Sequence, residues 1–323
     1  MDQKLKIGVL GAGHLGKIHL RLLQESSAYE LVGFYDSQPQ IAAKISREFG
    51  YRSFSDVNSL FDEVDVIDIV TPTLSHFELA KKALESGLHV FLEKPITATV
   101  KEADELVSLA KAKGLLGMVG QVERFNPAFM AANSHIQKPM FIEAHRLAEF
   151  NPRGTDVSVV LDLMIHDIDA ILSVVNSKVI DVQASGVSII SKTPDIANAR
   201  LHFDNGCVAN LTASRISMKN MRKSRFFQKD AYVAIDFLEK KNEIIDMQDV
   251  EEEDPFAITI DLGDKGKKQI NILSEDAAPN NAIEEELKSF VKAIESDNTP
   301  PVSIYEGTKA LQVAHEIMNK LTK

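Results

Sequence analysis

Apolar residues in roughly the first 120 positions alternate between short β-branched runs and longer stretches with helical spacing. The short runs predict strands and the longer stretches predict amphipathic helices. We expect strands at 5–10, 29–35, 64–70, 89–92 and 116–120, and helices at 14–26, 39–49, 74–86 and 99–113. Such alternation predicts a parallel sheet with helices on both faces, and these sheets bind ligands at the carboxyl ends of their strands.

The pattern changes after about residue 122. Strands now dominate, at 140–147, 179–188, 196–203, 207–214 and 231–238, with helices at 159–173, 281–296 and 303–321. Asp204-Asn-Gly206 predicts a hairpin, which makes its two strands antiparallel. The sequence therefore predicts an α/β domain over 1–122 and an α+β domain with a mostly antiparallel sheet over 123–323. We expect the acidic stretch Asp246–Asp254 to be a solvated loop or a sheet edge.

Two of the predicted helices begin with a reciprocal capping pattern. Thr99 precedes Glu102 by three residues, and Ser303 precedes Glu306 by the same spacing. In this pattern the hydroxyl and the carboxylate each accept a hydrogen bond from a backbone N–H of the first turn. Pro300-Pro301 separates the last two helices. These signals place helix starts at Thr99 and Ser303.

Composition narrows the class of protein. The 323 residues are 44% hydrophobic and 26% charged, as expected for an ordinary globular chain of about two domains. The single cysteine, Cys207, fits a reducing cytoplasm and excludes an internal disulfide. A net charge of −11 argues against a broad nucleic-acid surface. We expect neither a signal peptide, because a strand begins close to Met1, nor a membrane helix, which needs roughly 18 apolar residues.

A glycine cluster follows the first predicted strand and opens the first predicted helix. Gly11, Gly13 and Gly16 form the pattern G-x-G-x-x-G. The first glycine permits a tight turn, the second lets a pyrophosphate approach the backbone, and the third lets helix and strand pack closely. The phosphates would then meet the N–H groups at the helix start. A glycine turn without a ligand is the alternative interpretation.

The second predicted strand ends in Asp36, twenty residues after Gly16. A carboxylate at this place accepts hydrogen bonds from both ribose hydroxyls of NAD and repels the 2′-phosphate of NADP. Lys44 and Arg47 lie nearby toward the C-terminus, and no arginine directly follows Asp36. The sequence therefore favours NAD over NADP.

Glu93-Lys94-Pro95 lies at the carboxyl end of the fourth predicted strand, where cofactor and substrate are expected to meet. A lysine at this position can donate a hydrogen bond to a substrate oxygen and stabilise the charge that develops there. Pro95 restricts Lys94 to extended conformations and is a candidate for a cis bond. A surface lysine before a helix is the alternative. His76, after Thr71-Pro72, suggests a role at a helix start or at the cofactor's edge.

Asp162 and His166 lie four residues apart in an apolar helical stretch, which places them on one face. Asp169 continues that stripe, whereas Asp167 points elsewhere. A carboxylate beside an imidazole orders its tautomer and makes it a better proton acceptor. This is what oxidation of an alcohol requires, because a base must take the hydroxyl proton as the hydride leaves. A structural hydrogen bond and a metal site are the alternatives.

Basic residues gather between positions 215 and 225 in an otherwise acidic chain. Such a cluster can neutralise a diphosphate at the edge of a substrate cleft. A solvated loop or a subunit contact is the competing interpretation. The arginines proposed for a substrate pocket are Arg124, Arg146, Arg153, Arg215, Arg222 and Arg225.

At this point the chain resembles the Gfo/Idh/MocA family of sugar and inositol oxidoreductases over nearly its whole length. The resemblance rests on four motifs in order: Gly8–Gly16, Thr71-Pro72 with His76, Glu93-Lys94-Pro95, and the Asp162 to His166 pair. It implies a Rossmann domain followed by an open, mostly antiparallel sheet that forms a homodimer or homotetramer interface. Asp162–Asp169 and Gly120–Pro127 look like the branch that contains UDP-N-acetylglucosamine 3-dehydrogenases.

The resemblance also implies the roles of individual residues. Lys94 and His166 would be the catalytic pair, with Asp162 supporting His166. NAD, or with less support NADP, would be bound by Gly11, Gly13, His14, Leu15, Gly16, Asp36, Thr71, Pro72, His76, Glu93, Lys94 and Gln121. Many relatives carry glycines before the Asp, whereas this chain has Asp156-Val-Ser-Val-Val-Leu-Asp162.

The expected function is oxidation of a sugar hydroxyl to a ketone, on the 3-hydroxyl of a UDP-linked N-acetylamino sugar. A free sugar, an inositol or a small diol is the alternative substrate. A regulator that senses the dinucleotide without turnover is an alternative of a different class, although it has no need of Lys94, Asp162 and His166.

Overall fold

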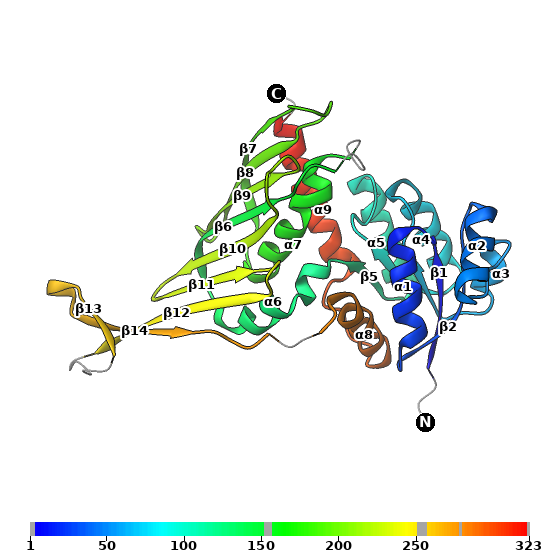
Figure 1. Cartoon of the computed structure of the whole chain (residues 1–323), viewed down its shortest axis with the longest axis horizontal. Helices are drawn as coiled ribbons and strands as arrows, with labels where there is room; N and C mark the ends of the chain where they lie inside the picture. The colour runs from blue at the N-terminus through cyan, green and yellow to red at the C-terminus, as the bar shows by residue number, and fades with distance from the viewer. Residues whose placement is uncertain (1–3, 152–156, 251–256, 278–279, 322–323) are drawn as a thin grey trace. The chain divides into compact units, whose positions relative to one another are not determined.

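The computed structural model describes all residues except 1–3, 152–156, 251–256, 278–279 and 322–323. The chain divides into two compact units. Figure 1 colours the whole chain from blue at the N-terminus to red at the C-terminus. The N-terminal unit comprises Met1–Val122 and Asn281–Gln312, and the C-terminal unit comprises Glu123–Asn280 and Val313–Lys323. The sequence had assigned all of 123–323 to the second domain. The two assignments differ over residues 281–312.

The N-terminal unit contains a five-stranded parallel sheet in the order β2-β1-β3-β4-β5. Its strands are β1 (Leu5–Leu10), β2 (Tyr29–Tyr35), β3 (Val66–Ile69), β4 (His89–Glu93) and β5 (Gly117–Gly120). Its helices are α1 (His14–Glu25), α2 (Pro39–Phe49), α3 (Val57–Phe61), α4 (His76–Glu85), α5 (Val100–Lys113) and α8 (Ala282–Glu295). This confirms the predicted α/β fold and all five of its strands, with shifts of at most two residues at their ends.

Residues 281–312 join the N-terminal unit because of side-chain contacts that no local pattern reveals. The Tyr29 hydroxyl donates a hydrogen bond to the Leu287 carbonyl at 3.2 Å, and the Phe290 ring lies 6.2 Å from that of Phe91. Both phenylalanines are fully buried. Farther along, the Val119 N–H donates to the Val302 carbonyl at 2.9 Å. Helix α8 and the segment that follows it thus extend the core of the parallel sheet.

The C-terminal unit contains a nine-stranded sheet in the order β13-β14-β12-β11-β10-β6-β9-β8-β7. Its strands are β6 (Pro139–Leu147), β7 (Val179–Val187), β8 (Ile196–Phe203), β9 (Val208–Ser214), β10 (Met221–Gln228), β11 (Ala231–Asp236), β12 (Lys241–Val250), β13 (Ile258–Asp261) and β14 (Lys267–Leu273). All neighbours are antiparallel except β6 and β9, which are parallel. The predicted mostly antiparallel sheet and the hairpin at Asp204–Gly206 are both confirmed.

Helices α6 (Pro127–Ala132) and α7 (Ile165–Val174) cover one face of this sheet, and β13 and β14 extend it beyond β12 (Figure 1). Helix α9 (Ile304–Leu321) begins in the N-terminal unit and ends in the C-terminal unit. The short 3-10 turns are η1 (Thr73–Ser75), η2 (Val122–Phe125), η3 (Asn133–His135) and η5 (Gly263–Lys265). No helix in the described part of the chain is long and apolar enough to cross a membrane.

Two segments expected to be loops are strands. Met221–Gln228, inside the basic cluster, is β10 and lies between β6 and β11. Asp246–Val250, the first half of the acidic stretch, is the end of β12 and not a loop; it pairs with β14, whereas the pairing of β12 with β11 ends at Asp246, so the segment beyond Asp246 has a strand partner on one side, as the alternative of a sheet edge implies. The rest of that stretch lies outside the described residues. Both segments carry charged side chains on both faces, Arg222 and Arg225 in the first and Asp246 and Asp249 in the second, which hid the alternation expected of strands.

Candidate functional site

The three glycines between β1 and α1 meet three different steric demands. Gly11 has a φ of +96°, and a Cβ there would approach the Val70 carbonyl oxygen to 2.8 Å. A Cβ at Gly16 would collide with the carbonyl oxygen of Gly11. A Cβ at Gly13 would meet nothing within 4 Å. Gly11 and Gly16 are therefore required by the turn itself, whereas Gly13 borders open space that a pyrophosphate can approach.

Asp36 is held beside this turn at the end of β2. Its Oδ2 accepts a hydrogen bond from the Ala12 N–H at 2.8 Å, and its Oδ1 accepts one from the Gln38 N–H at 2.9 Å. The carboxylate is half-buried. It is thus oriented by the backbone at the place where a bound dinucleotide presents its ribose. His14 is exposed and Leu15 half-exposed at the start of α1.

His76 connects the loops that follow β3 and β4. Its ring is buried, with Nε2 at 2.8 Å from the Thr71 carbonyl oxygen and Nδ1 at 3.0 Å from the Pro95 carbonyl oxygen. The Ser75 hydroxyl lies 2.8 Å from the carbonyl oxygen of Pro72 and stabilises the first of these loops. His76 therefore orders the two loops from inside, which agrees with the expected role at a helix start.

Glu93 and Lys94 lie at the carboxyl end of β4, and Gln121 directly follows β5. The Lys94–Pro95 peptide bond is cis, as its sequence suggested. The Lys94 N–H donates to Glu93 Oε2 at 3.2 Å. Gln121 is 1% exposed, and its Oε1 has no hydrogen-bond partner among the described residues. An unsatisfied buried amide oxygen at the carboxyl end of β5 fits a ligand with hydrogen-bond donors, such as a dinucleotide.

One buried polar residue of this unit was not recognised from the sequence. His19 is fully buried in α1, where it contacts Asp68 of β3 and Glu93 of β4. The available signal was a polar residue on the buried stripe of an amphipathic helix, next to Leu20 and Leu23. Such a residue needs polar partners from another element.

Asp162 and His166 lie in the C-terminal unit, at the point where a π-helical turn, η4 (Val160–Met164), leads into α7. Both side chains are half-exposed, whereas the flanking Ile165 and Asp167 are buried. The pair therefore occupies the accessible part of this segment. The helix was expected, but the wider first turn was not, and single π turns are frequent at functional sites.

Arg146 is not a substrate ligand. Its guanidinium is 3% exposed and donates Nε and Nη2 to the Asp167 carboxylate at 3.0 and 2.8 Å, and Nη1 to Glu123 Oε1 at 2.7 Å. Burial lowers the pKa of Arg146, but the charges of Asp167 and Glu123 outweigh it and raise that pKa above its usual value. This network attaches α7 and η2 to β6. The guanidinium N–H donors that the sequence suggested for a diphosphate are thus bonded to Asp167 and Glu123.

The other proposed arginines are scattered. Arg124 lies 3.6 Å from Asp169, and the buried Arg215 donates Nη2 to the Val157 carbonyl at 2.5 Å. Arg222 is 49% exposed and its Nη1 lies 3.5 Å from Glu123 Oε1. Arg225 lies 3.8 Å from Glu143. Arg153 lies outside the described residues.

Arg222 and Arg225 point to opposite faces of the sheet and cannot line one pocket. Arg222 pairs in register with Arg146, and the alternate residues Ser224 and Phe226 are buried on the face that α7 covers. Arg225 pairs with Glu143 on the other face. The expectation of a single basic cluster is corrected, because successive side chains of a strand alternate between faces.

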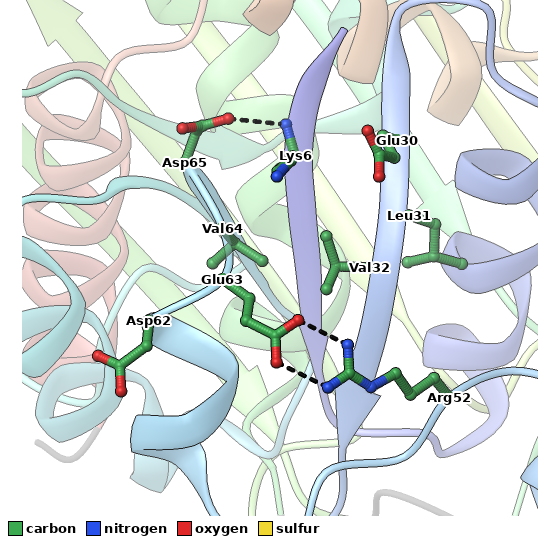
Figure 2. A pocket seen from close by; sticks show the side chains of 9 residues that line it. All are labelled: Lys6, Glu30, Leu31, Val32, Arg52, Asp62, Glu63, Val64 and Asp65. Carbon is green, nitrogen blue, oxygen red and sulfur yellow. Dashed lines mark hydrogen bonds and ion pairs between the residues drawn. The ribbon is translucent and has the colours of Figure 1, made fainter.

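The N-terminal unit contains a depression of about 530 Å³, shown in Figure 2. Its walls come from the first half of β1, the first half of β2 and the segment before β3, at the amino ends of the strands. Arg52 and Glu63 form a doubly hydrogen-bonded pair across it, at 2.6 Å each. Parallel sheets bind ligands at the opposite ends, so this depression is not the cofactor site. Within the described residues, no group of three or more His, Cys, Asp or Glu is arranged to hold a metal.

The N-terminal unit has a parallel sheet, a glycine turn that leaves room for a ligand, an acidic residue after β2 and a lysine after β4. Together these features define a dinucleotide-binding oxidoreductase. Family comparisons agree. Residues 5–121 match the model described as "Oxidoreductase family, NAD-binding Rossmann fold", and residues 117–228 match the "GFO/IDH/MocA C-terminal domain".

Relatives with curated names support the same assignment. The chain is 38% identical over 235 residues to the UDP-N-acetylglucosamine 3-dehydrogenase of Acidithiobacillus ferrooxidans, covering 72% of this chain and 74% of that one. A solved structure of that enzyme has a TM-score of 0.88 and 32% identity, covering 99% and 98% of the two chains. The scyllo-inositol 2-dehydrogenase (NAD(+)) of Bacillus subtilis is 29% identical, covering 67% and 69%.

The chain belongs to the Gfo/Idh/MocA family of oxidoreductases. It is an NAD-dependent dehydrogenase, and its Rossmann unit is the NAD-binding part. The fold, enzyme class and cofactor expected from the sequence are thereby confirmed.

Proposed function

We propose that this enzyme oxidises the 3-hydroxyl of a UDP-linked N-acetylamino sugar to a ketone. The observation that carries the substrate class is the 38% identity, over 72% of the chain, to an enzyme named for this reaction. Arg222 supports it, because it is an exposed cation on the α7 face of the sheet.

In the proposed mechanism, His166 accepts the proton of the sugar hydroxyl and Asp162 orients its imidazole. Lys94 donates a hydrogen bond to the reacting oxygen and stabilises the charge that develops on it. NAD, when bound, supplies the hydride acceptor. Gly11, Gly13, His14, Leu15, Gly16, Asp36, Thr71, Pro72, His76, Glu93, Lys94 and Gln121 are proposed to hold it.

The substrate proposal is tested by mixing the purified protein with NAD and one candidate alcohol at a time, and following NADH by its absorbance. We expect NADH to form with UDP-N-acetylglucosamine at a kcat/KM at least about tenfold above that for inositol, because a site that recognises a polar group strongly rejects substrates lacking it. Faster turnover of inositol or a free sugar would replace the nucleotide sugar as substrate. Binding of NAD without turnover of any alcohol would favour the dinucleotide-sensing regulator.

Arg222→Met is expected to raise the KM for the UDP-sugar at least about tenfold. A charge-assisted hydrogen bond to a phosphate contributes about 1.5–3 kcal/mol, and 1.4 kcal/mol corresponds to about tenfold. Arg225→Met is the matched control, since it removes the same charge from the same strand on the other face. Steady-state kinetics would measure both. Equal effects of the two substitutions would remove Arg222 from the substrate site.

We also infer a homodimer or homotetramer that forms through the sheet face opposite α7. A row of apolar side chains crosses this face in register: Phe141, Phe227, Tyr232, Ile245 and Ile272. The Phe227 ring lies 6.0 Å from that of Phe141 and 5.0 Å from that of Tyr232. Phe227 is 37% exposed and Ile272 is 56% exposed. A row of this kind favours burial against a second copy of the chain.

Phe227→Glu is expected to dissociate this oligomer, because it places a charge in the middle of the row. Light scattering after size exclusion would give the mass of each variant. Phe49→Glu, at an aromatic residue of α2 that is 49% exposed, is the control and should leave the mass unchanged. A monomeric wild-type protein at micromolar concentration would contradict the proposal.

A further inference from the structure

A buried histidine lies between two carboxyl groups at the carboxyl end of β4. His19 of α1 and Asp68 of β3 are both fully buried, and the side chain of Glu93 is 12% exposed. His19 Nδ1 lies 2.8 Å from Asp68 Oδ2, and Nε2 lies 3.3 Å from Glu93 Oε1. The second contact is long for a hydrogen bond, so it is mainly an ion pair. Three elements of the Rossmann unit are thus connected through one imidazole.

The two contacts favour a doubly protonated ring. A carboxylate accepts hydrogen bonds and donates none, and a neutral imidazole has a single N–H. With a carboxyl group on each side, an imidazolium donates its Nδ1–H to Asp68 and directs its second N–H toward Glu93. Burial lowers the pKa of His19, but the charge and hydrogen bond of Asp68 together with those of Glu93 raise it well above the usual value.

Burial has the larger effect on Asp68. Its pKa is raised, first by desolvation and further by the charge of Glu93, while the charge and hydrogen bond of His19 oppose the shift. Tyr29 is a neighbouring titratable group, and its pKa is raised by burial and by the charge of Asp68. The Phe91 ring, 6.1 Å from the imidazole, closes the cluster on an apolar side. His19 therefore opposes the rise in the pKa of Asp68 inside the protein.

The cluster reaches Lys94 through Glu93. One carboxylate oxygen of Glu93 faces His19, and the other accepts the Lys94 N–H at 3.2 Å. Glu93 also packs over Gly120 of the neighbouring strand, where a Cβ would meet its Oε1 at 2.8 Å. The Glu93 carboxylate is thus held by its contact with His19. It occupies space beside Gly120 that a side chain at that residue would fill.

We propose that His19 is a positioning residue: as an imidazolium bound to Asp68, it holds the Glu93 carboxylate and, through it, the backbone of Lys94 in the geometry needed for hydride transfer. The effect on catalysis rests on the proposed role of Lys94. The charge state of His19 does not, because it follows from contacts within the Rossmann unit.

The charge state is tested on the wild-type protein by nuclear magnetic resonance. A long-range proton–nitrogen correlation spectrum at pH 7.5 is expected to show both ring nitrogens of His19 protonated, whereas an ordinary histidine is mostly neutral at that pH. The resonance is assigned by its loss in His19→Asn and by its contact with the Phe91 ring. A spectrum with one unprotonated nitrogen would overturn the proposal, whatever the substrate of the enzyme.

The positioning role is tested by kinetics of His19→Asn. We expect kcat to fall at least about tenfold, because misplacement of a reacting group by 1 Å costs up to about 100-fold. The Kd for NAD should change less than kcat does, because most residues proposed to hold NAD do not contact Glu93. A merely structural role would lower the melting temperature and leave kcat per folded molecule unchanged. Such a result would refute the proposal.

His89→Asn is the matched control. His89 lies at the other end of β4, is half-buried, and accepts the Leu116 N–H at 3.0 Å through Nδ1, away from both carboxylates. It should leave kcat unchanged. If instead the wild-type protein turns over no alcohol, the proposed function fails, and the protonation of His19 is still decided by the spectrum.

Discussion

Replacing His166 by alanine is expected to lower kcat at least about 100-fold and to leave the Kd for NAD nearly unchanged. Loss of a positioned general base costs roughly 10²–10⁴-fold. His166 is half-exposed at the start of α7, between buried neighbours, so its removal opens no core cavity. The residues proposed to bind NAD all come from the other compact unit. Binding and turnover should therefore separate in this variant.

The measurement combines NADH absorbance for kcat with calorimetry for the Kd of NAD. His145→Ala is the control, since His145 of β6 is half-buried in the same unit but lies on the sheet face opposite α7. It should keep the wild-type kcat. Near-normal turnover by His166→Ala would remove this residue from the mechanism, and equal losses in both variants would indicate a general structural effect.

Local signals predicted the Rossmann unit well because each acts within a few residues. Both capping boxes form: Thr99 and Glu102 bond reciprocally, and so do Ser303 and Glu306. The glycines at 11 and 16 are required by the turn for the steric reasons that their spacing implied. Such features depend on backbone geometry close in sequence, which is what a single chain displays.

Features that depend on distant partners were missed. The assignment of α8 to the first unit depends on contacts such as that between Tyr29 and Leu287, which are 258 positions apart. His19 became recognisable when β3 and β4 placed carboxylates beside it. Arg146 was interpreted as a substrate ligand because its partners, Glu123 and Asp167, are more than 20 residues away on either side. Sequence shows a charge but not whether it is neutralised.

Arg146→Met is expected to lower the free energy of unfolding by about 3–5 kcal/mol at pH 7. The substitution keeps an unbranched apolar side chain at this position and leaves Glu123 and Asp167, both at most 6% exposed, without the guanidinium that lies between them. Breaking a buried ion pair by removing one partner has a cost of this size, because an uncompensated charge remains in a low-dielectric environment. Urea unfolding followed by circular dichroism would measure it.

Arg52→Met is the comparison that isolates burial. The pair of Arg52 with Glu63 is also doubly hydrogen-bonded, at 2.6 Å, but its side chains are 58% and 41% exposed (Figure 2). Solvent screens exposed pairs and they contribute little to stability, so this variant should be nearly as stable as the wild type. A loss as large as that of Arg146→Met would show that the bonding pattern, and not desolvation, determines the cost.

The pH dependence separates charge from packing in Arg146→Met. Burial already raises the pKa of Asp167 above its usual value, against the opposing charge and hydrogen bonds of Arg146. Without the arginine this pKa rises further, so the folded variant takes up a proton that the unfolded chain lacks at the same pH. Stability contributed by that proton is present in acid and is lost as pH rises through the folded pKa. The deficit of the variant should therefore shrink from pH 7 toward about pH 5, whereas a deficit caused by lost packing would not change with pH.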